Sequence, residues 1–375
     1  MKASVVMYRM LLVVLGLQLT TLPALASEGS GERKPFVIRM LKTVQQIIDT
    51  MAVKGVDTTY IGRPHRPWSV ELRTDVNHAT LRMEATMELE DVEPMFWEAS
   101  THNGYAPSVG AWVGYRGYGI GLSRALKRDG SSFSLGAVGG SFGMNLRIKS
   151  YSSYQPTLRV YGHDDEGKYD EKIPWDIDDP INVKSTFIDA YYLFNGHRFS
   201  YAAAYDQSLI QRRSAGSLMV GAMYNHSKVT YDSDTNFLLL AMMNDVGKID
   251  FTQFSVGAGY AYNWVPARNW LVNVMLMPMV TLYNRMTVYY YGYDIDGMQG
   301  NDDLLDDDVS IYLTSKERTK NQLSWNYDAR LCVGYNWERC YMRVYGHYNS
   351  FRYKNDAGKG RLTDWTAYAA LGFRF

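Results

Sequence analysis

Charged residues spaced two apart give the first indication of chemistry in this chain. In WSVELRTDVN, residues 68–77, Glu71, Arg73 and Asp75 alternate with apolar residues. Residues two apart on an extended strand lie on the same face, so these acids and bases would share a face, where they can pair or attract charged solutes. The charged residues that this spacing places on such a face are Glu71, Arg73, Asp75, Arg147, Lys149, Asp189, Asp328, Arg330, Arg343 and Arg374. This mixture of acids and bases, with a small excess of bases, predicts a paired network with a slight preference for anions.

Serine and histidine motifs raise the alternative of a hydrolase. GGSFG, residues 139–143, matches the G-x-S-x-G pattern with Ser141 as nucleophile. That pattern needs a strand, a sharp elbow and a helix, whereas the following MNLRIKSY alternates as a strand does, so a hairpin turn is the better interpretation. The pairs His226-Ser227 and His347 with Asn349 are the other candidates for a lipid-modifying hydrolase. No catalytic residue is assigned, and we expect no enzyme activity.

Two acidic segments could attract cations. YGYDIDGMQGNDDLLDDD, residues 291–308, offers many carboxylates but does not fit the calcium-loop pattern. Residues 162–180 are similarly acidic. Solvated loops are the main interpretation, and weak bridging by divalent cations to lipopolysaccharide is the alternative. The sequence therefore predicts no resident metal and no cofactor.

The N-terminus predicts export. A basic start with Lys2 and Arg9 precedes an apolar run, and Ala24-Leu25-Ala26 resembles a cleavage site. We expect a signal peptide over residues 1–26, with cleavage near Ala26. Its removal takes away two bases and no acids from a chain with 39 of each, so the mature protein has no basic excess, and nucleic acid is not an expected partner.

A periplasmic segment is expected next, over residues 27–67. Within it, residues 35–53 place apolar side chains at helical spacing opposite charged and amide side chains, with Pro35 at the start. This amphipathic helix could pack on the barrel's periplasmic end, rest on lipid or enter the lumen. Residues 68–375 then form the predicted outer-membrane β-barrel.

Alternating segments of strand length follow. Tyrosine and glycine are abundant, at 30 and 32 residues, and the alternating segments are short, which is typical of a membrane barrel or a soluble sandwich. We predict twelve strands at residues 68–77, 107–116, 118–126, 131–139, 141–151, 183–194, 214–230, 251–264, 269–284, 321–337, 340–353 and 363–375. Short links then fall at one end and long loops at the other, provided that residues 197–215 are a periplasmic excursion, folded into the barrel mouth or near it.

The last strand supports the membrane interpretation. In LTDWTAYAALGFRF the apolar residues alternate up to Phe373 and Phe375, which resembles the outer-membrane assembly signal. Only a closed sheet leaves no unpaired strand edge in lipid. The fold class is therefore all-β, a transmembrane antiparallel up-and-down barrel. The expected partners are outer-membrane lipids, lipopolysaccharide and the barrel-assembly machinery. Cys332 and Cys340 face opposite sides of a predicted hairpin, so we expect two free thiols.

Four stretches together resemble a family. They are DTTYIGRPHRPWSVELRTD, PSVGAWVGYRGYGIGLS, QSLIQRRSAGSLMVG and YAYNWVPARNWLVNV. Together they are similar to a Bacteroidetes family of outer-membrane β-barrels classed as a domain of unknown function, over about residues 55–375. The resemblance implies the barrel fold and brings no assigned activity or catalytic residue.

The leading functional hypothesis is a narrow channel or passive transporter for small polar solutes. A lipid-modifying hydrolase or a structural surface protein is the alternative. If solutes pass, Arg73, Arg147 and Arg330 would shape the passage; otherwise they cross-link the wall. Substrate, oligomeric state and an open or plugged lumen are left open by the sequence.

Overall fold

The computed structural model describes residues 55–87, 95–102, 106–127, 129–154, 156–164, 167–174, 177, 179–232, 240, 245–295, 309–320, 323–337, 339–354 and 358–375. The predicted signal peptide, the predicted helix at residues 35–53 and most of the acidic run at residues 291–308 lie outside these residues. The described residues belong to one compact unit, Ile48–Phe375, and almost all of them are in strands.

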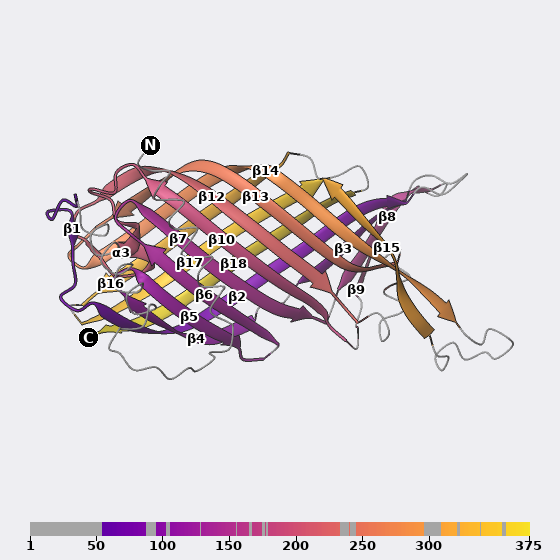
Figure 1. Ribbon diagram of the computed structural model, residues 1–375, viewed down its shortest axis with the longest axis horizontal. Helices are drawn as coiled ribbons and strands as arrows, with labels where there is room; N and C mark the ends of the chain where they lie inside the picture. Colours follow the sequence, from indigo (N-terminus) through magenta and orange to yellow (C-terminus); the bar gives the residue numbers. More distant parts are fainter. Residues whose placement is uncertain are drawn as a thin grey trace, which may run out of the picture. The chain divides into compact units, whose positions relative to one another are not determined.

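Twelve antiparallel strands form a closed sheet (Figure 1). They are β2 (Trp68–Met87), β4 (Ala106–Tyr115), β5 (Tyr118–Ala125), β6 (Gly130–Val138), β7 (Phe142–Ser153), β10 (Ile181–Leu193), β12 (Ala215–Thr230), β13 (Val246–Trp264), β14 (Trp270–Ile295), β16 (Trp325–Asn336), β17 (Cys340–Lys354) and β18 (Gly358–Arg374). Each pairs with the next along the chain. The predicted twelve-stranded barrel is confirmed.

The first and last strands close the barrel. β18 pairs with β2 from Gly358 opposite Ala85 to Arg374 opposite Ser69. Beyond this ladder, the Phe375 amide donates to the Trp68 carbonyl at 3.1 Å. Because every barrel strand therefore has two neighbours, no strand edge of the barrel is left for lipid to satisfy.

The two faces of each strand differ as the alternation predicts. On β2 the Leu72 side chain is 62% exposed, whereas Glu71 beside it is fully buried. The exposed apolar residues continue around the outside, and include Val113, Ile120, Leu122, Leu218, Val274, Leu276, Leu331, Val344 and Leu371. Exposed tryptophans at strand ends, Trp68, Trp264, Trp270 and Trp337, form a ring of the kind that marks a lipid–water boundary. This outer surface suits hydrocarbon.

Short turns gather at the end of the barrel that carries Trp68 and Phe375. Hairpins join β4 to β5, β6 to β7, β13 to β14 and β16 to β17. The longest link at this end, residues 194–214, holds the helix α3 (Tyr201–Tyr205) and strand β11 (Ile210–Gln211), which pairs with β1 (Ile61–Gly62). Bacterial barrels keep short turns on the periplasmic side, so this is the periplasmic mouth. The interpretation of residues 197–215 as an excursion from the wall is confirmed.

At the other end, the long segments expected to be loops contain strands. β3 (Met95–His102), β8 (Thr157–Asp164), β9 (Gly167–Pro174) and β15 (Val309–Lys320) extend the sheet beyond the closed barrel (Figure 1). They form because β2 and β14 run well past the expected strand ends, and β3 and β15 pair with these overhangs while β8 and β9 continue from β3. The sequence boundaries were too short here because residues 78–106, 152–182 and 285–320 were assigned to long loops, although parts of them alternate as strands do, for example Leu158 and Val160 on β8.

Both cysteines are free, as expected. In the β16–β17 hairpin Cys332 lies opposite Tyr345, while Cys340 is exposed at the periplasmic end. Among the described residues, no helix combines the length and apolar character that crossing a membrane requires.

The outward face generates a prediction about stability. Leu276, on β14, is 54% exposed and lies within the apolar belt. Leu276→Arg should destabilise the barrel by about 2–4 kcal/mol because lipid cannot solvate a charge near the midplane. Reversible denaturant unfolding in phospholipid vesicles measures this change. Tyr312→Arg is the control, since Tyr312 is 49% exposed on β15 outside the closed barrel; equal losses in both variants would contradict the membrane-facing assignment.

Candidate functional site

The inward positions of the barrel carry the polar chemistry. The structure places all ten charged residues predicted for this face on the interior side of their strands. Many of their contacts join strands that are not neighbours in the sheet, such as β7 with β17 and with β18, and these contacts must cross the interior. The interior is therefore a connected polar core on one side of the barrel.

The first group of contacts surrounds Glu71. Its carboxylate accepts from Arg343 at 2.8 and 2.9 Å, from Arg73 at 2.6 Å and from the Tyr341 hydroxyl at 2.9 Å. Both Glu71 and Arg343 are fully withdrawn from solvent. The Arg73 guanidinium also stacks on Trp112, 4.3 Å from the ring centre. Two bases share one acid here, which leaves positive charge near the periplasmic mouth.

The second group crosses the middle of the barrel. Arg330 donates to Asp328 at 2.6 Å and to Asp189 at 3.0 Å. Asp189 also accepts from Arg147 at 3.2 Å, and Asp328 contacts His347 at 2.9 Å. Arg147 donates to His347, which completes a ring of contacts through β7, β10, β16 and β17. Buried ions need such partners, because an unpaired buried charge costs several kcal/mol.

The third group includes an acid that the sequence interpretation missed. Lys149 donates to both Asp364 oxygens, at 2.7 and 2.9 Å, and to Thr366 at 2.8 Å. Thr366 in turn donates to Asn77 at 2.6 Å, and Asn77 donates to Asp75. Asp364 is two residues before Thr366 on the final strand, so the two side chains point to the same face. Continuing the inward set of Thr366, Tyr368 and Arg374 by one more position toward the N-terminus would have found it.

Arg374 differs from the other predicted bases. Its guanidinium is 1% exposed and donates to the Asn336 side chain at 2.7 Å and the Gln207 carbonyl at 2.9 Å. Within the described part of the chain it makes no ion pair with a carboxylate. Its hydrogen bonds instead hold the end of the α3 segment inside the mouth.

The helix α3 fills the periplasmic mouth. Ser200 caps it by accepting from the Ala203 amide at 3.1 Å, and the side chains of α3 are mostly buried. The Tyr201 hydroxyl accepts from Arg330, and the Tyr205 hydroxyl donates to Asn273. Arg343 donates to the Tyr205 carbonyl. Side chains of the barrel wall thus bind both the hydroxyls and the free carbonyls of the helix, and these contacts hold the excursion inside the periplasmic mouth.

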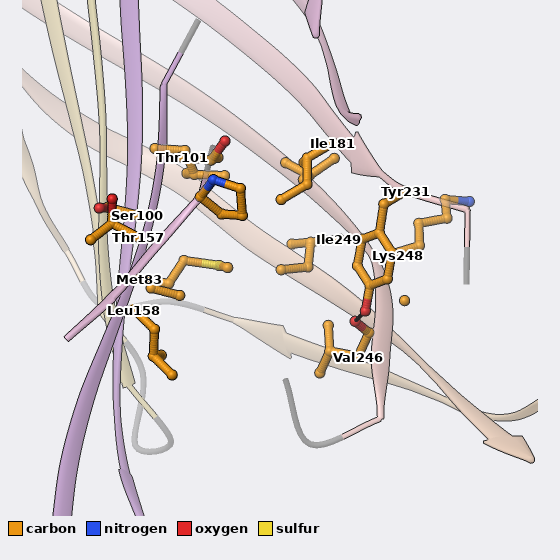
Figure 2. A pocket seen from close by; sticks show the side chains of 15 residues that line it. Met83, Ser100, Thr101, Thr157, Leu158, Ile181, Tyr231, Val246, Lys248 and Ile249 are labelled. Atoms are coloured by element: carbon orange, nitrogen blue, oxygen red, sulfur yellow. Dashed lines mark hydrogen bonds between the residues drawn. The ribbon is translucent and has the colours of Figure 1, made fainter. Parts of the chain in front are cut away.

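Apolar side chains make up part of the outer interior, beside buried polar residues such as Gln253 and Asn326. Phe187 on β10 and Phe351 on β17 stack with ring centres 5.7 Å apart, although their strands are not neighbours. Beyond this pair lies a small apolar pocket of about 50 Å³, around which Met83, Ile181 and Ile249 converge (Figure 2). An apolar patch around the Phe187–Phe351 pair therefore lies on the extracellular side of the ion pairs.

A polar cavity of about 140 Å³ lies beside the ion pairs and next to Tyr201 and Tyr205 of α3; we call it the interior cavity. Serines on β5 and β6, Ser123, Ser132 and Ser134, form part of its wall, and their small side chains leave the space open. The charged residues that line it are Arg73, Arg147, Lys149, Arg330 and Asp75, together with His347. The four bases in this lining outnumber its one acid, and each base also pairs with an acid: Arg73 with Glu71, Arg147 with Asp189, Lys149 with Asp364, and Arg330 with Asp189 and Asp328.

The hydrolase candidates do not assemble into a dyad. Ser141 lies in the β6–β7 turn. His226 and Ser227 are adjacent on a strand and point to opposite faces; His226 contacts Thr252, whereas Ser227 donates to Ser185 at 2.8 Å. His347 is held by Asp328 and Arg147. In the described ranges no group of three or more histidine, cysteine or acidic side chains is arranged to hold a metal ion.

The sequence of the barrel matches a known protein family. The chain belongs to the family described as Domain of unknown function (DUF4421), whose model matches residues 56–375. No curated protein is significantly similar in sequence.

Solved structures with some similarity are outer-membrane barrels. The protease OmpT from Escherichia coli is 8% identical, with a TM-score of 0.37, covering 83% of this chain and 97% of OmpT. The translocator domain of the autotransporter NalP from Neisseria meningitidis is 10% identical, with a TM-score of 0.31 and coverage of 90% and 97%. OprG from Pseudomonas aeruginosa is 9% identical, with a TM-score of 0.25 and coverage of 84% and 99%.

The Glu71–Arg343 pair generates a stability prediction. Glu71→Gln should destabilise the barrel by about 3–5 kcal/mol, because it leaves the Arg343 guanidinium buried without its counter-charge. Denaturant unfolding in vesicles measures the loss. The double variant Glu71→Gln, Arg343→Met should recover part of it, since both charges are then gone. A double variant as unstable as the sum of the single variants would contradict a direct coupling.

Proposed function

We propose that the barrel is a gated, narrow conduit for small polar solutes, with a preference for anions. One observation carries this proposal: Arg73, Arg147, Lys149 and Arg330 line the interior cavity against the single acid Asp75. Bases that outnumber acids around a confined polar space favour anions, and the acids paired with these bases limit the preference to a slight one. A cavity of about 140 Å³ has room for a few water molecules or one small anion.

We infer that α3 and the Phe187–Phe351 pair obstruct the passage in this conformation, so that transport requires movement. α3 occupies the periplasmic mouth through Tyr201, Tyr205 and their partners. Because the excursion leaves the barrel wall after β10 and re-enters it at β12, it can leave the mouth without breaking the wall ladder. The Phe187–Phe351 stack is the second barrier, and rotation of the two rings would open it. The excursion is the proposed gate.

The setting of this function is part of the proposal. We propose that the mature chain begins after Ala26 and enters the outer membrane of a Bacteroidetes bacterium with the aid of the assembly machinery, through the signal at Phe373 and Phe375. Lipopolysaccharide would surround the extracellular half. The expectation that the chain is not an enzyme stays a prediction.

Planar-bilayer conductance tests the gate. The double variant Tyr201→Ala, Tyr205→Ala removes the hydroxyls that tie α3 to Arg330 and Asn273, so we expect open events that are several-fold more frequent than in the unchanged protein. Reversal potentials in a potassium chloride gradient should show anion preference. Adding Lys149→Gln should reduce that preference, since it removes a cation from the cavity lining.

The matched control uses two tyrosines on the lipid face of β13. Tyr260→Ala, Tyr262→Ala removes the same side chains from positions that are exposed outside the barrel, and conductance should not change. Folding of every variant is checked by resistance of the barrel to unfolding in detergent. Folded double variants at Tyr201 and Tyr205 that carry no current, or a current selective for cations, would overturn the proposal.

A further inference from the structure

The outer wall of the barrel changes character toward its extracellular end. The strands β10, β12, β13 and β14 are consecutive neighbours in the wall (Figure 1). Across them runs an apolar row of residues that are paired in turn, Ile188, Tyr224, Phe254 and Tyr283. Phe254 and Tyr283 are each 38% exposed, and the residues two positions further out on all four strands are polar or charged. This row therefore marks the extracellular edge of the apolar outer surface on these strands.

Three further rows continue the same outward face and extend it onto β15. Each row is two residues beyond the one before, so its side chains lie on the same face of the sheet. In order from β10 to β15, the rows are Thr186, His226, Thr252, Arg285 and Lys320; then Lys184, Lys228, Asp250, Thr287 and Arg318; then Asn182, Thr230, Lys248, Tyr289 and Lys316. We call their lysines and arginines the basic patch. Asp250 is the only acid in these rows.

Two lysines of the basic patch directly oppose each other. Lys184 on β10 is the cross-strand partner of Lys228 on β12, and both side chains are exposed. Like charges at directly opposite positions of an antiparallel pair are destabilising. Within the part of the chain that the structure describes, neither lysine forms an ion pair. An anion held between the two ammonium groups would remove their repulsion.

Tyr289 brings two further lysines together. The Nζ atom of Lys248 is 4.0 Å from the centre of the Tyr289 ring, and that of Lys316 is 4.8 Å from it. Asp250 is already engaged here, since it pairs with Lys248 at 3.5 Å and accepts from the Tyr289 hydroxyl at 3.1 Å. One acid cannot offset the bases of all three rows, so the patch keeps a positive charge.

The position of the basic patch favours an amphiphilic ligand. Its bases adjoin the apolar row on the same outward face, so one molecule could contact both surfaces only if it carried acyl chains and an anionic headgroup. The patch lies toward the extracellular end of the wall, which corresponds to the outer leaflet of the membrane. Because the patch is on the outside of the barrel, a solute in the interior cavity would not meet it.

We propose that the basic patch binds the phosphate-bearing headgroup of lipopolysaccharide, with the acyl chains of the same molecule against the apolar wall. Lysine and arginine bind phosphate oxygens through charge-assisted hydrogen bonds. Lys184 and Lys228 would hold a phosphate group between them, and the bases of β14 and β15 would bind further anionic groups of the headgroup. This contact is direct, unlike the bridging by divalent cations that the acidic segments suggested. The proposal rests on the proposed outer-membrane setting and is independent of the conduit.

Native mass spectrometry of the full-length protein, released from mixed detergent micelles, tests this site. The probes are lipid A, the phosphate-bearing lipid part of lipopolysaccharide, and the same lipid A after enzymatic removal of its phosphate. We expect the protein to retain the phosphorylated form at least about tenfold better, because charge-assisted contacts require the phosphate. Lys184→Gln, Lys228→Gln should reduce that retention at least about tenfold for the same reason.

Thermal unfolding in detergent supplies a second readout. Both lysines are exposed on the outer face, and their replacement removes the repulsion between them. Without lipid A, the double variant should therefore be no less stable than the unchanged protein. Phosphorylated lipid A should raise the unfolding temperature of the unchanged protein and leave that of the variant unaltered.

The matched control is Lys168→Gln, Lys172→Gln. These lysines are exposed on β9 at the extracellular end and lie outside the basic patch, so their loss removes the same charge and should leave retention within about twofold. Equal retention by the two double variants, or equal retention of the two forms of lipid A, would overturn the proposal. Phosphatidylglycerol or inorganic phosphate bound as tightly as lipid A would also overturn it, since the patch would then be a general anion site. A barrel that carries no current would leave these measurements unaffected.

Discussion

The pairing of β18 with β2 is the constraint on which the rest of the structure depends. A strand edge in hydrocarbon would leave amides and carbonyls without partners, each at a cost of several kcal/mol. The ladder from Gly358–Ala85 to Arg374–Ser69 removes that edge. Once the sheet is closed, each strand has one face in lipid and one face inside. Polar side chains then have only the interior to occupy, which is why the charges of distant strands meet there.

The interior behaves as a protein core with two characters. Phenylalanine, methionine and aliphatic side chains fill part of it, including Phe187, Met223 and Met275. A network of ion pairs through β2, β7, β10, β16, β17 and β18 fills another part, and serines leave an unfilled space beside it. The two parts share strands, since β10 contributes Phe187 to the apolar cluster and Asp189 to the ion pairs.

The barrel could be predicted from the sequence because apolar and polar side chains alternate along its strands with a period of two residues. The twelve strands, the inward set around Glu71 and Arg330, and the excursion at residues 197–215 all followed from counting faces and loop lengths. The partners within the interior did not follow, because β7 meets β17 and β18 only through the curvature of the closed sheet. The overhanging strands β3, β8, β9 and β15 were missed because long connections were assigned to loops, although apolar residues such as Leu158 and Val160 alternate on β8.

The cross-barrel contacts of β18 have a consequence for how the protein matures. Asp364 is the acid that pairs with Lys149, and Arg374 donates to the Gln207 carbonyl at the end of the excursion. Until the last strand has been added, Lys149 lacks its carboxylate and the excursion lacks one of its anchors. Wall completion and settling of the internal segment should therefore be a single cooperative event. In an intermediate that lacks the final strand, water would have to solvate the internal charges that β18 later pairs. Water would be excluded from these groups only after β18 has joined the sheet.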